Sequence, residues 1–416
     1  MRSPLSILIF VAIMILLDLY VFQAIRSVTH HASPRTRGIV TACYWGLSIL
    51  SIAGFLIFAT TTPQTFPKAI RTYLFAIVVG LFLAKLVAIT FLIIDDLRRF
   101  IQWVAGKLMF NNTEGERMAS DGISRSAFLS WLALAAGTTL FGSLLVGFRN
   151  KYNYKTRKVK LNYPNLPSSF RGMKIVHISD IHCGSFMHPK EVEDGIETIL
   201  GHKPDIIFFT GDLVNDRASE MEPYMEMFSR LKAPFGVYSI LGNHDYGDYA
   251  PWPHNGISKS QNMSNLHQVH SELGWRLLIN EHAVIEKNNE RIAVLGVENW
   301  SARGRFPKYG KLQDAHKGTD GIPFKILLSH DPSHWEEEVR PSYRDIDLTL
   351  SGHTHGMQFG VEVPGFKWSP VQYMYRYWAG LYGEDNQKLY VNRGFGFIGY
   401  PGRVGILPEI TVIELA

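Results

Sequence analysis

Four long apolar segments at the beginning of the chain set the strongest limit on how it can fold. They are residues 4–25, 39–61, 73–94 and 127–148, each about 20 residues long and almost free of charge. An α-helix rises about 1.5 Å per residue, so about 20 apolar residues cross a hydrocarbon core about 30 Å thick. Four such segments are too many for a cleavable signal peptide. We therefore predict a membrane domain of four transmembrane helices over residues 1–150.

Asp18 is the ionisable exception within the first apolar segment. A charged group at that depth is costly and is a candidate for a functional role, but we favour a structural interpretation, in which Asp18 faces the helix bundle or the limits of the span differ from residues 4–25. Lysines and arginines divide almost evenly between the two sides of a four-span topology. The chain is therefore expected in the cell membrane as a multi-pass protein, with the side of its second half unresolved.

The rest of the chain has a different composition. The chain has 416 residues, of which 46% are hydrophobic and 19% charged, and residues 151–416 have the mixture of a soluble domain large enough for one α/β core. Residues 151–170 are rich in basic residues and then in proline and serine, which predicts a basic linker and entry segment before a domain at 171–416. The basic residues suit anionic lipid headgroups, topology control or a solvated linker. A net charge of +5 is modest, so no nucleic-acid partner is expected.

Short apolar runs alternate with helical segments in the second half. Strands are predicted at residues 174–179, 205–210 and 236–241, separated by helices at 191–200 and 221–231. This alternation favours parallel pairing. A second series of strands follows, at 283–286, 291–297, 325–328, 348–350, 388–391 and 409–415. The predicted fold is an α/β (α+β) domain of two packed mixed β-sheets flanked by helices.

Acids, amides and histidines come directly after several of these strands. They are Asp180, His182, Asp212, Asn243, His244, Asp245, His330, His353 and His355. In open α/β sheets, ligands collect at the carboxyl ends of the strands. Carboxylate, amide and imidazole groups suit Mn, Fe, Zn or Ni, and a pair of divalent ions can activate water and neutralise a phosphate. Glycines 211, 242 and 352 precede three of these groups and permit unusual backbone angles. The pattern indicates a binuclear metal site that hydrolyses phosphate esters.

The same groups resemble the calcineurin-like metallophosphoesterase superfamily, whose pattern is D-x-H, G-D, G-N-H-D/E, a lone histidine and G-H-x-H. The resemblance covers about residues 174–416 and implies a role for each residue. Asp180, His182 and His355 would hold one ion, Asn243, His330 and His353 the other, and Asp212 would bridge them together with an attacking hydroxide. His244 would stabilise the transition state or protonate the leaving oxygen, and Asp245 would orient the His244 ring. The implied cofactor is two divalent ions, with Mn²⁺ first and Fe, Zn or Ni as alternatives.

Finer motifs are similar to one membrane-associated bacterial branch. They include Ser-His-Asp-Pro at 329–332, Ser-Gly-His-Thr-His-Gly-Met-Gln at 351–358 and Asn-Arg-Gly at 392–394. That branch is similar to UDP-2,3-diacylglucosamine pyrophosphatases, which implies a membrane-anchored phosphohydrolase acting on a lipid-linked or nucleotide phosphodiester or pyrophosphate. Two aromatic-rich loops, 246–253 and 359–378, are candidates for substrate contacts or for ordinary packing. Arg393 is a candidate for phosphate contact or structural pairing. The first alternative is a noncatalytic membrane scaffold. The second is a transporter, which agrees less well with the motifs.

Overall fold

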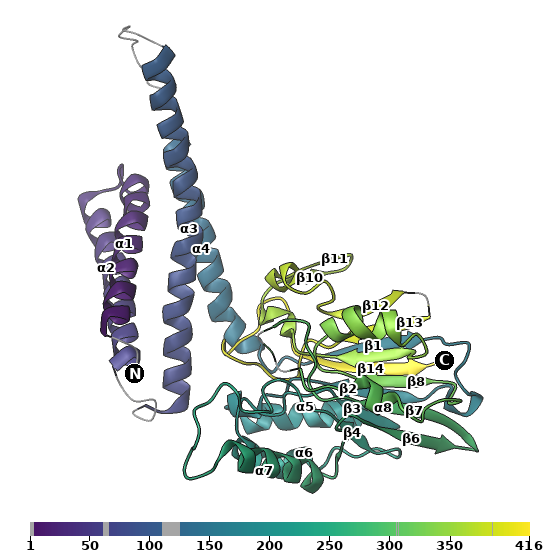
Figure 1. The fold of residues 1–416 in the computed structure, drawn as a ribbon. Helices are drawn as coiled ribbons and strands as arrows, with labels where there is room; N and C mark the ends of the chain where they lie inside the picture. The colour runs from purple at the N-terminus through teal and green to yellow at the C-terminus, as the bar shows by residue number, and fades with distance from the viewer. Residues whose placement is uncertain (1–3, 61–65, 110–124, 305, 307, 385) are drawn as a thin grey trace. The chain divides into compact units, whose positions relative to one another are not determined.

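The computed structural model of the chain describes residues 4–60, 66–109, 125–304, 306, 308–384 and 386–416. It divides into two compact units, Met1–Val146 and Gly147–Ala416, which we describe separately (Figure 1). Four long helices dominate the first unit: α1 (Pro4–Val28), α2 (Pro34–Thr60), α3 (Lys68–Met109) and α4 (Arg125–Gly147). Each contains a stretch long and apolar enough to cross a membrane, so the prediction of four long apolar helices is confirmed.

Asp18 lies in the interior of the first unit, as expected. Its side chain is fully buried, and one carboxylate oxygen accepts a hydrogen bond of 2.8 Å from the hydroxyl of Ser48. The hydroxyl of Tyr44 donates to the Asp18 backbone carbonyl at 2.8 Å. Lys85 of α3 forms an ion pair with the carboxylate. These polar partners offset the cost of burying the Asp18 carboxylate in an apolar helix.

Two six-stranded sheets form the centre of the second unit. The first sheet has the order β1 (Lys155–Leu161), β14 (Glu409–Leu415), β2 (Lys174–Ile178), β3 (Ile206–Phe209), β4 (Val237–Ser239) and β5 (Arg276–Leu277). The second has the order β12 (Gly380–Glu384), β13 (Gln387–Val391), β9 (Leu348–Ser351), β8 (Lys325–Leu328), β7 (Glu290–Gly296) and β6 (Glu281–Lys287). Strands β2 to β5 are parallel, as are β7, β8, β9 and β13. A separate hairpin joins β10 (Val361–Val363) to β11 (Phe366–Trp368).

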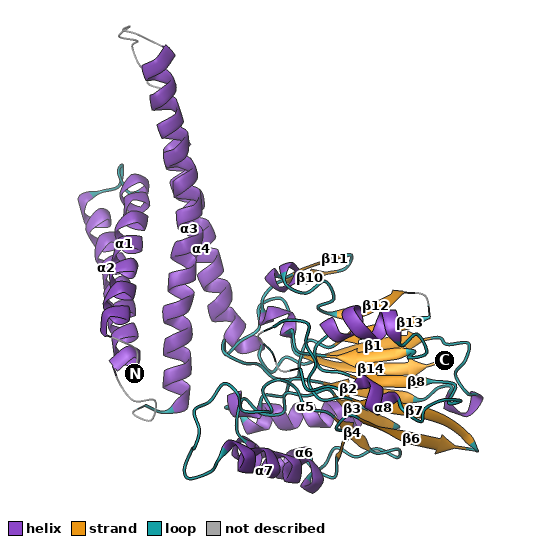
Figure 2. Cartoon of the chain, viewed as in Figure 1, coloured by secondary structure: helices purple, strands orange, loops and turns teal. Residues whose placement is uncertain are grey.

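The two sheets pack against each other and are covered by helices on their outer faces. Buried side chains such as Phe208 of the first sheet and Ile326 of the second share one apolar cluster. Helices α5 (Pro189–Gly201), α6 (Met225–Phe228) and α7 (Lys259–Glu272) cover the other face of the first sheet (Figure 2). The outer face of the second sheet is covered by α8 (Leu312–His316) and the π-turn η6 (Trp335–Val339), and α9 (Arg340–Ser342) follows η6 directly. The predicted architecture of two mixed sheets flanked by helices is therefore confirmed.

Short helical turns complete the second unit. They are η2 (Phe148–Asn150), η3 (Ser168–Phe170), η4 (Cys183–Ser185), η5 (Ala218–Tyr224), η7 (His355–Gln358) and η8 (Pro370–Tyr373). Of these, η4 follows the predicted ligand His182 directly, and η7 begins at the predicted ligand His355. The site is thus built on tight turns rather than long loops.

Two sequence-based expectations differ from the structure. Residues 409–415 were expected in the second sheet, but β14 lies in the first sheet, parallel to β1 and antiparallel to β2. Residues 151–170 were expected as a linker, yet they contribute β1 and the buried side chains of Tyr163 and Phe170 to the second unit. The basic residues belong to an edge strand, where lysine is common because it discourages further strand pairing.

Candidate metal centre

The predicted ligands lie on turns that follow parallel strands of both sheets. Asp180 and His182 follow β2, Asp212 follows β3, and Asn243 comes shortly after β4. The second sheet contributes His330 after β8, and His353 and His355 after β9. Five of these residues have a positive φ: Asp180 (52°), His182 (48°), Asp212 (61°), His353 (70°) and His355 (50°). Left-handed backbone is uncommon for such side chains and collects at functional sites, where the surrounding structure holds it in place.

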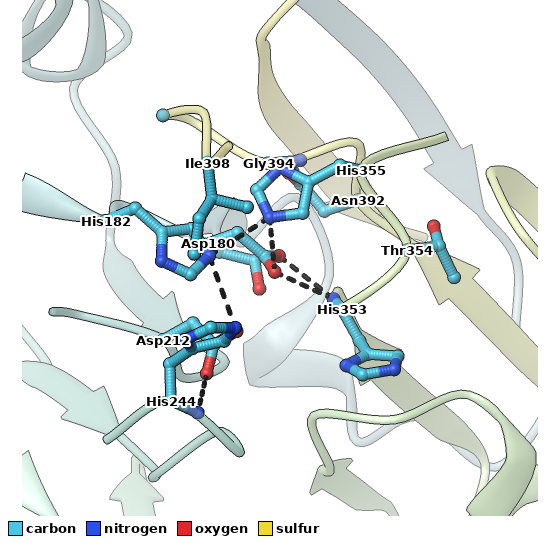
Figure 3. A network of polar contacts seen from close by, with 12 residues as sticks. Asp180, His182, Asp212, His244, His353, Thr354, His355, Asn392, Gly394 and Ile398 are labelled. Carbon is cyan, nitrogen blue, oxygen red and sulfur yellow. Dashed lines mark hydrogen bonds and ion pairs between the residues drawn. The ribbon is translucent and has the colours of Figure 1, made fainter. Parts of the chain in front are cut away.

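Asp180, His182 and His355 form the first cluster (Figure 3). Each can offer an atom within 4.8 Å of the others. Nε2 of His355 lies 3.2 Å from a carboxylate oxygen of Asp180 and 3.1 Å from Nε2 of His182. All three residues are buried. Two imidazole nitrogens and a carboxylate therefore converge on one small volume.

Asp212, His330 and His353 form the second cluster by the same criterion. Oδ2 of Asp212 lies 3.2 Å from Nε2 of His330 and 3.4 Å from Nε2 of His182 in the first cluster. The same oxygen thus stands between the two groups. Asn243 joins the second cluster, with its Oδ1 2.8 Å from Nδ1 of His353. The structure brings all seven predicted ligands together.

Glycines beside the clusters provide room as well as backbone freedom. Gly211 has a φ of 93°, as its position before Asp212 led us to expect. Gly352 differs, because a Cβ there would collide with the side chains of Ser179 and Asp180. The expectation of unusual backbone angles therefore holds at Gly211 and is wrong at Gly242 and Gly352, where glycine is instead needed for close approach to Asp212 and Asp180.

A second layer of hydrogen bonds fixes the rings, and sequence reasoning missed most of it. The carbonyl oxygen of Thr210 lies 2.7 Å from Nδ1 of His330, which leaves Nε2 facing Asp212. The hydroxyl of Tyr375 lies 2.9 Å from Nε2 of His353, on the side away from Asn243. Partners of this kind set the tautomer and orientation of metal-binding histidines. Tyr375 fell within the aromatic-rich loop 359–378, but nothing in the local sequence separates it from its aromatic neighbours.

Arg403 supports the first cluster from behind. This residue is fully buried, and its guanidinium donates to the backbone carbonyls of His355, Arg393, Gly394 and Gly396. One of its nitrogens also lies 3.3 Å from Nδ1 of His355. Burial lowers the pKa of Arg403 to about 9, although the nearby carboxylates of Asp180 and Glu409 oppose this effect. A single side chain therefore holds the carbonyl of His355, which has a left-handed backbone, together with three carbonyls of residues 393–396.

The electrostatics of the clusters favour a cation. Burial on its own raises the pKa of Asp180, but the imidazoles of His355 and His330 hold it well below its usual value. Burial lowers the pKa of His182, which keeps this ring neutral. His330 behaves differently, since the charge of Asp212 outweighs burial and raises its pKa to about 10. Carboxylates bind metals in their ionised form, and imidazoles bind metals in their neutral form. The negative charge of the buried carboxylates, which favours a metal cation, also favours the protonated form of His330.

The ring of His244 lies beside the metal ligands but is not held by Asp245. The backbone N–H of His244 donates to Asp212 at 2.8 Å, and its ring lies 5.0 Å from the ring of His182. Nδ1 of His244 lies 2.8 Å from the carbonyl oxygen of Asn215. The expectation that Asp245 orients this ring is therefore wrong, because a backbone carbonyl does so.

Asp245 instead joins two ligand-bearing turns. Its Oδ2 accepts backbone N–H groups of Gly242 and Asp212, both at 2.8 Å. Its Oδ1 accepts those of Leu213 at 2.8 Å and Val214 at 3.3 Å. The reversal of the chain after Asn243 points the carboxylate back into the protein, where burial and the charge of Asp212 raise its pKa to about 7. We describe Asp245 as a positioning residue.

The clusters open into a small cleft of about 190 Å³. His244 lies in its wall together with ligands from both clusters. The remaining walls are mostly apolar or aromatic and consist of Phe306, Thr354, Met357, Val371, Met374, Tyr375 and Ile398. Loop 359–378 thus reaches the cleft. Arg393 does not line it: this buried arginine pairs with Glu362 and Glu409, which confirms the structural alternative.

The donor set fits a pair of divalent cations. Nε2 of His330 is a buried ring nitrogen without a well-aligned hydrogen-bond partner among the described residues, and it points toward Asp212. Two buried carboxylates, four imidazoles and one amide oxygen surround this position. Hard oxygens and imidazoles in this number suit Mn, Fe, Zn or Ni rather than Ca²⁺, which prefers oxygen alone. Such a centre at strand ends of a two-sheet α/β domain defines a metal-dependent phosphoesterase.

Comparisons with known proteins agree with this class. Residues 1–151 match the family model described as "Probable Calcineurin-like phosphoesterase, transmembrane domain", and residues 173–357 match "Calcineurin-like phosphoesterase". The Bacillus subtilis metallophosphoesterase YkuE is 30% identical over 299 residues, which cover 70% of this chain and 98% of the relative. The chain belongs to the calcineurin-like metallophosphoesterases. It is a membrane-associated, metal-dependent phosphoesterase.

Two other relatives extend the comparison. A Bos taurus "Transmembrane protein with metallophosphoesterase domain" is 27% identical over 420 residues, which cover 97% of this chain and 87% of the relative. Escherichia coli "Phosphodiesterase YaeI" is 28% identical over 244 residues, which cover 58% of this chain and 82% of the relative. The first comparison spans both units, and the second covers fewer residues than the second unit contains.

Proposed function

We propose that this chain is a multi-pass phosphodiesterase of the cell membrane with two divalent ions in its active site. Asp180, His182 and His355 would hold one ion, and Asn243, His330 and His353 the other. Asp212 would bridge them. Mn²⁺ is our first candidate, with Fe, Zn and Ni as alternatives. The observation that carries the proposal is the position of Asp212 Oδ2, within 3.4 Å of His182 and 3.2 Å of His330.

Bound divalent ions would lower the pKa of water and neutralise charge on the phosphate. The chain's own contribution is orientation and proton transfer. His244 lies in the wall of the cleft, and its Nδ1 is held by the carbonyl of Asn215. Nδ1 would therefore carry the proton, leaving Nε2 for the substrate. This ring can stabilise the developing charge or protonate the leaving oxygen, according to its protonation state.

The substrate we propose has a phosphodiester or pyrophosphate next to an apolar group. The cleft places polar ligand atoms beside Phe306, Met357 and Met374. A similar relative is named a phosphodiesterase, which supports the diester chemistry. Attachment of the catalytic unit to four membrane helices gives it access to lipid-linked molecules. UDP-2,3-diacylglucosamine is one compound of this kind.

Turnover of bis-p-nitrophenyl phosphate tests the activity. Full-length protein in detergent with Mn²⁺ should hydrolyse this diester, and chelation should abolish the reaction. Asp212→Ala and His244→Ala should each reduce kcat by at least about 100-fold. His267→Ala is the matched control, because His267 is an exposed histidine on α7, and its activity should be unchanged. Full activity of Asp212→Ala would refute the assignment.

Two further measurements test the metal content and the proposed substrate separately. Metal analysis of protein purified without added metal should find close to two ions per chain. Bound ions without turnover of any diester, monoester or pyrophosphate would instead favour a noncatalytic membrane scaffold. Incubation with UDP-2,3-diacylglucosamine should release UMP detectable by mass spectrometry. Turnover of the model diester without UMP release would reject this compound and leave the diesterase activity standing.

A further inference from the structure

The hairpin formed by β10 and β11 turns its apolar side chains outward and its charged side chains inward, which is the reverse of an ordinary surface hairpin. Val361 pairs with Trp368 and Val363 with Phe366, so these four side chains share one face of the ribbon. This face is turned outward: Val361, Val363 and Phe366 are 46%, 53% and 57% exposed. We call these four residues the apolar face of the hairpin. It projects from the catalytic unit in Figure 1.

The charged residues of the hairpin point the other way and hold it in place. Glu362 pairs with Arg393 and with Arg157 of β1. Lys367 donates to the carbonyl of Ala379 and, at 3.0 Å, to the hydroxyl of Tyr382. The inner face is therefore anchored by ionic and hydrogen-bonded contacts, and the outward direction of the apolar face follows from this anchoring.

The exposed apolar surface continues from the hairpin toward the metal cleft. Nε1 of Trp368 lies 3.5 Å from the hydroxyl of Tyr373, and Tyr373 is the most exposed large hydrophobic residue of the described chain, at 78%. Met374 and Met357 are also exposed, and both line the cleft. Contiguous apolar surface of this kind marks a contact with a membrane, a protein or a ligand.

The base of the hairpin is bonded to the loop that receives the end of α4. The N–H of Gly360 donates to the carbonyl of Val404 at 2.8 Å, and the N–H of Val404 donates to Gln358 at 2.8 Å. One residue earlier, the N–H of Arg403 donates to the carbonyl of Gly147 at 3.0 Å. Gly147 is the last residue of α4, and the fourth candidate span is Ser126–Asn150. Adjacent residues of one loop therefore hold both the membrane exit of the chain and the hairpin.

We propose that the apolar face of the β10–β11 hairpin docks on the lipid bilayer. Its valines and aromatic rings would enter the interfacial region of the leaflet from which α4 emerges. Aromatic residues favour that region, and valine side chains gain from leaving water. The bonds to loop 403–404 keep the hairpin base close to the point of membrane exit, which favours lipid over a second copy of the chain. The proposal does not depend on which reaction the metal site catalyses.

Fluorescence quenching in lipid vesicles tests this docking. The background is full-length protein with Cys43→Ser, because Cys43 is exposed and Cys183 is buried. Val363→Cys carries a bimane label on the apolar face. Val284→Cys on β6 is the matched control, since Val284 is a strand valine that is 42% exposed at the edge of the second sheet. Both proteins are reconstituted in phosphatidylcholine–phosphatidylglycerol vesicles with and without lipids that carry a nitroxide at acyl carbon 5.

Nitroxide lipid should quench the label at residue 363 at least about threefold more than the label at residue 284. Aqueous iodide should quench the control more strongly. Quenching of the residue-363 label by iodide but not by lipid would overturn the proposal, because the face would be in water. Shielding of that label from both quenchers would also overturn it and would point to a second copy covering the hairpin.

Discussion

Replacing Asp245 by asparagine distinguishes two roles for this residue. If Asp245 orients His244, the substitution should slow catalysis and leave metal binding intact. The structure instead has its two carboxylate oxygens accept four backbone N–H groups, from Gly242, Asp212, Leu213 and Val214. Those groups belong to the turns that carry Asp212 and Asn243. We therefore expect Asp245→Asn to weaken metal binding.

The hydrogen bonds set the expected magnitude. Asparagine keeps one oxygen and turns an amide NH₂ toward two of the four N–H donors, so two hydrogen bonds are lost. A bond to a charged acceptor contributes about 1.5–3 kcal/mol, which gives about 3–6 kcal/mol. We take the lower end, about 3 kcal/mol, because burial and Asp212 raise the pKa of Asp245 to about 7 and reduce its charge at neutral pH. If the whole loss of about 3 kcal/mol acts on the placement of the metal ligands, metal affinity falls about 100-fold.

A double-mutant cycle with His244→Ala provides the assay. Mn²⁺ dissociation constants are measured by calorimetry for the wild type, Asp245→Asn, His244→Ala and the double variant. The loss caused by Asp245→Asn should be similar in both backgrounds, because the two residues act on different parts of the site. An unchanged metal affinity in Asp245→Asn, together with a turnover loss that disappears in the His244→Ala background, would refute this reasoning and restore the orienting role.

Three other substitutions test separate parts of the molecule. Tyr375→Phe removes the hydroxyl 2.9 Å from His353 and should lower kcat or Mn²⁺ affinity about tenfold in steady-state and binding assays, without changing thermal stability. Arg403→Lys cannot serve all four carbonyls, and thermal unfolding followed by fluorescence should show a loss of about 2–3 kcal/mol; an unchanged midpoint would contradict this. Asp18→Asn removes the carboxylate partner of the partly buried Lys85 at a cost of up to about 3 kcal/mol, so size-exclusion profiles should show less folded protein, while kcat per folded molecule stays unchanged.

The membrane segments and the ligand positions could be predicted because each follows from a local constraint. A bilayer demands about 20 consecutive apolar residues, and this requirement is visible in any stretch of sequence. Parallel strands place their following residues at one edge of a sheet, so Asp180 and Asp212 were expected close together. The structure brings them together, and the imidazole of His330 lowers the pKa of both carboxyl groups.

Features that depend on distant segments could not be predicted in the same way. The position of β14 in the first sheet is decided by pairing with β1 and β2, more than 230 residues earlier. The basic sequence of β1 on its own resembles a linker, because its strand conformation depends on pairing with the distant β14. Asp245 follows His244 in the sequence, which suggested an interaction between their side chains. The turn carries the carboxylate to the other side of the backbone, and only the three-dimensional path reveals this.

Arg403 links Gly147, the first residue of the second unit, to the metal site. Its backbone N–H is bonded to Gly147, at the end of α4, while its side chain is bonded to the carbonyl of His355. Since His355 has a φ of 50°, its turn depends on such outside bonds rather than on local backbone preference. Removing Gly147 would leave one end of this connection without its partner. A catalytic fragment should therefore begin before residue 147, well upstream of the position 171 at which the recognisable domain begins in the sequence.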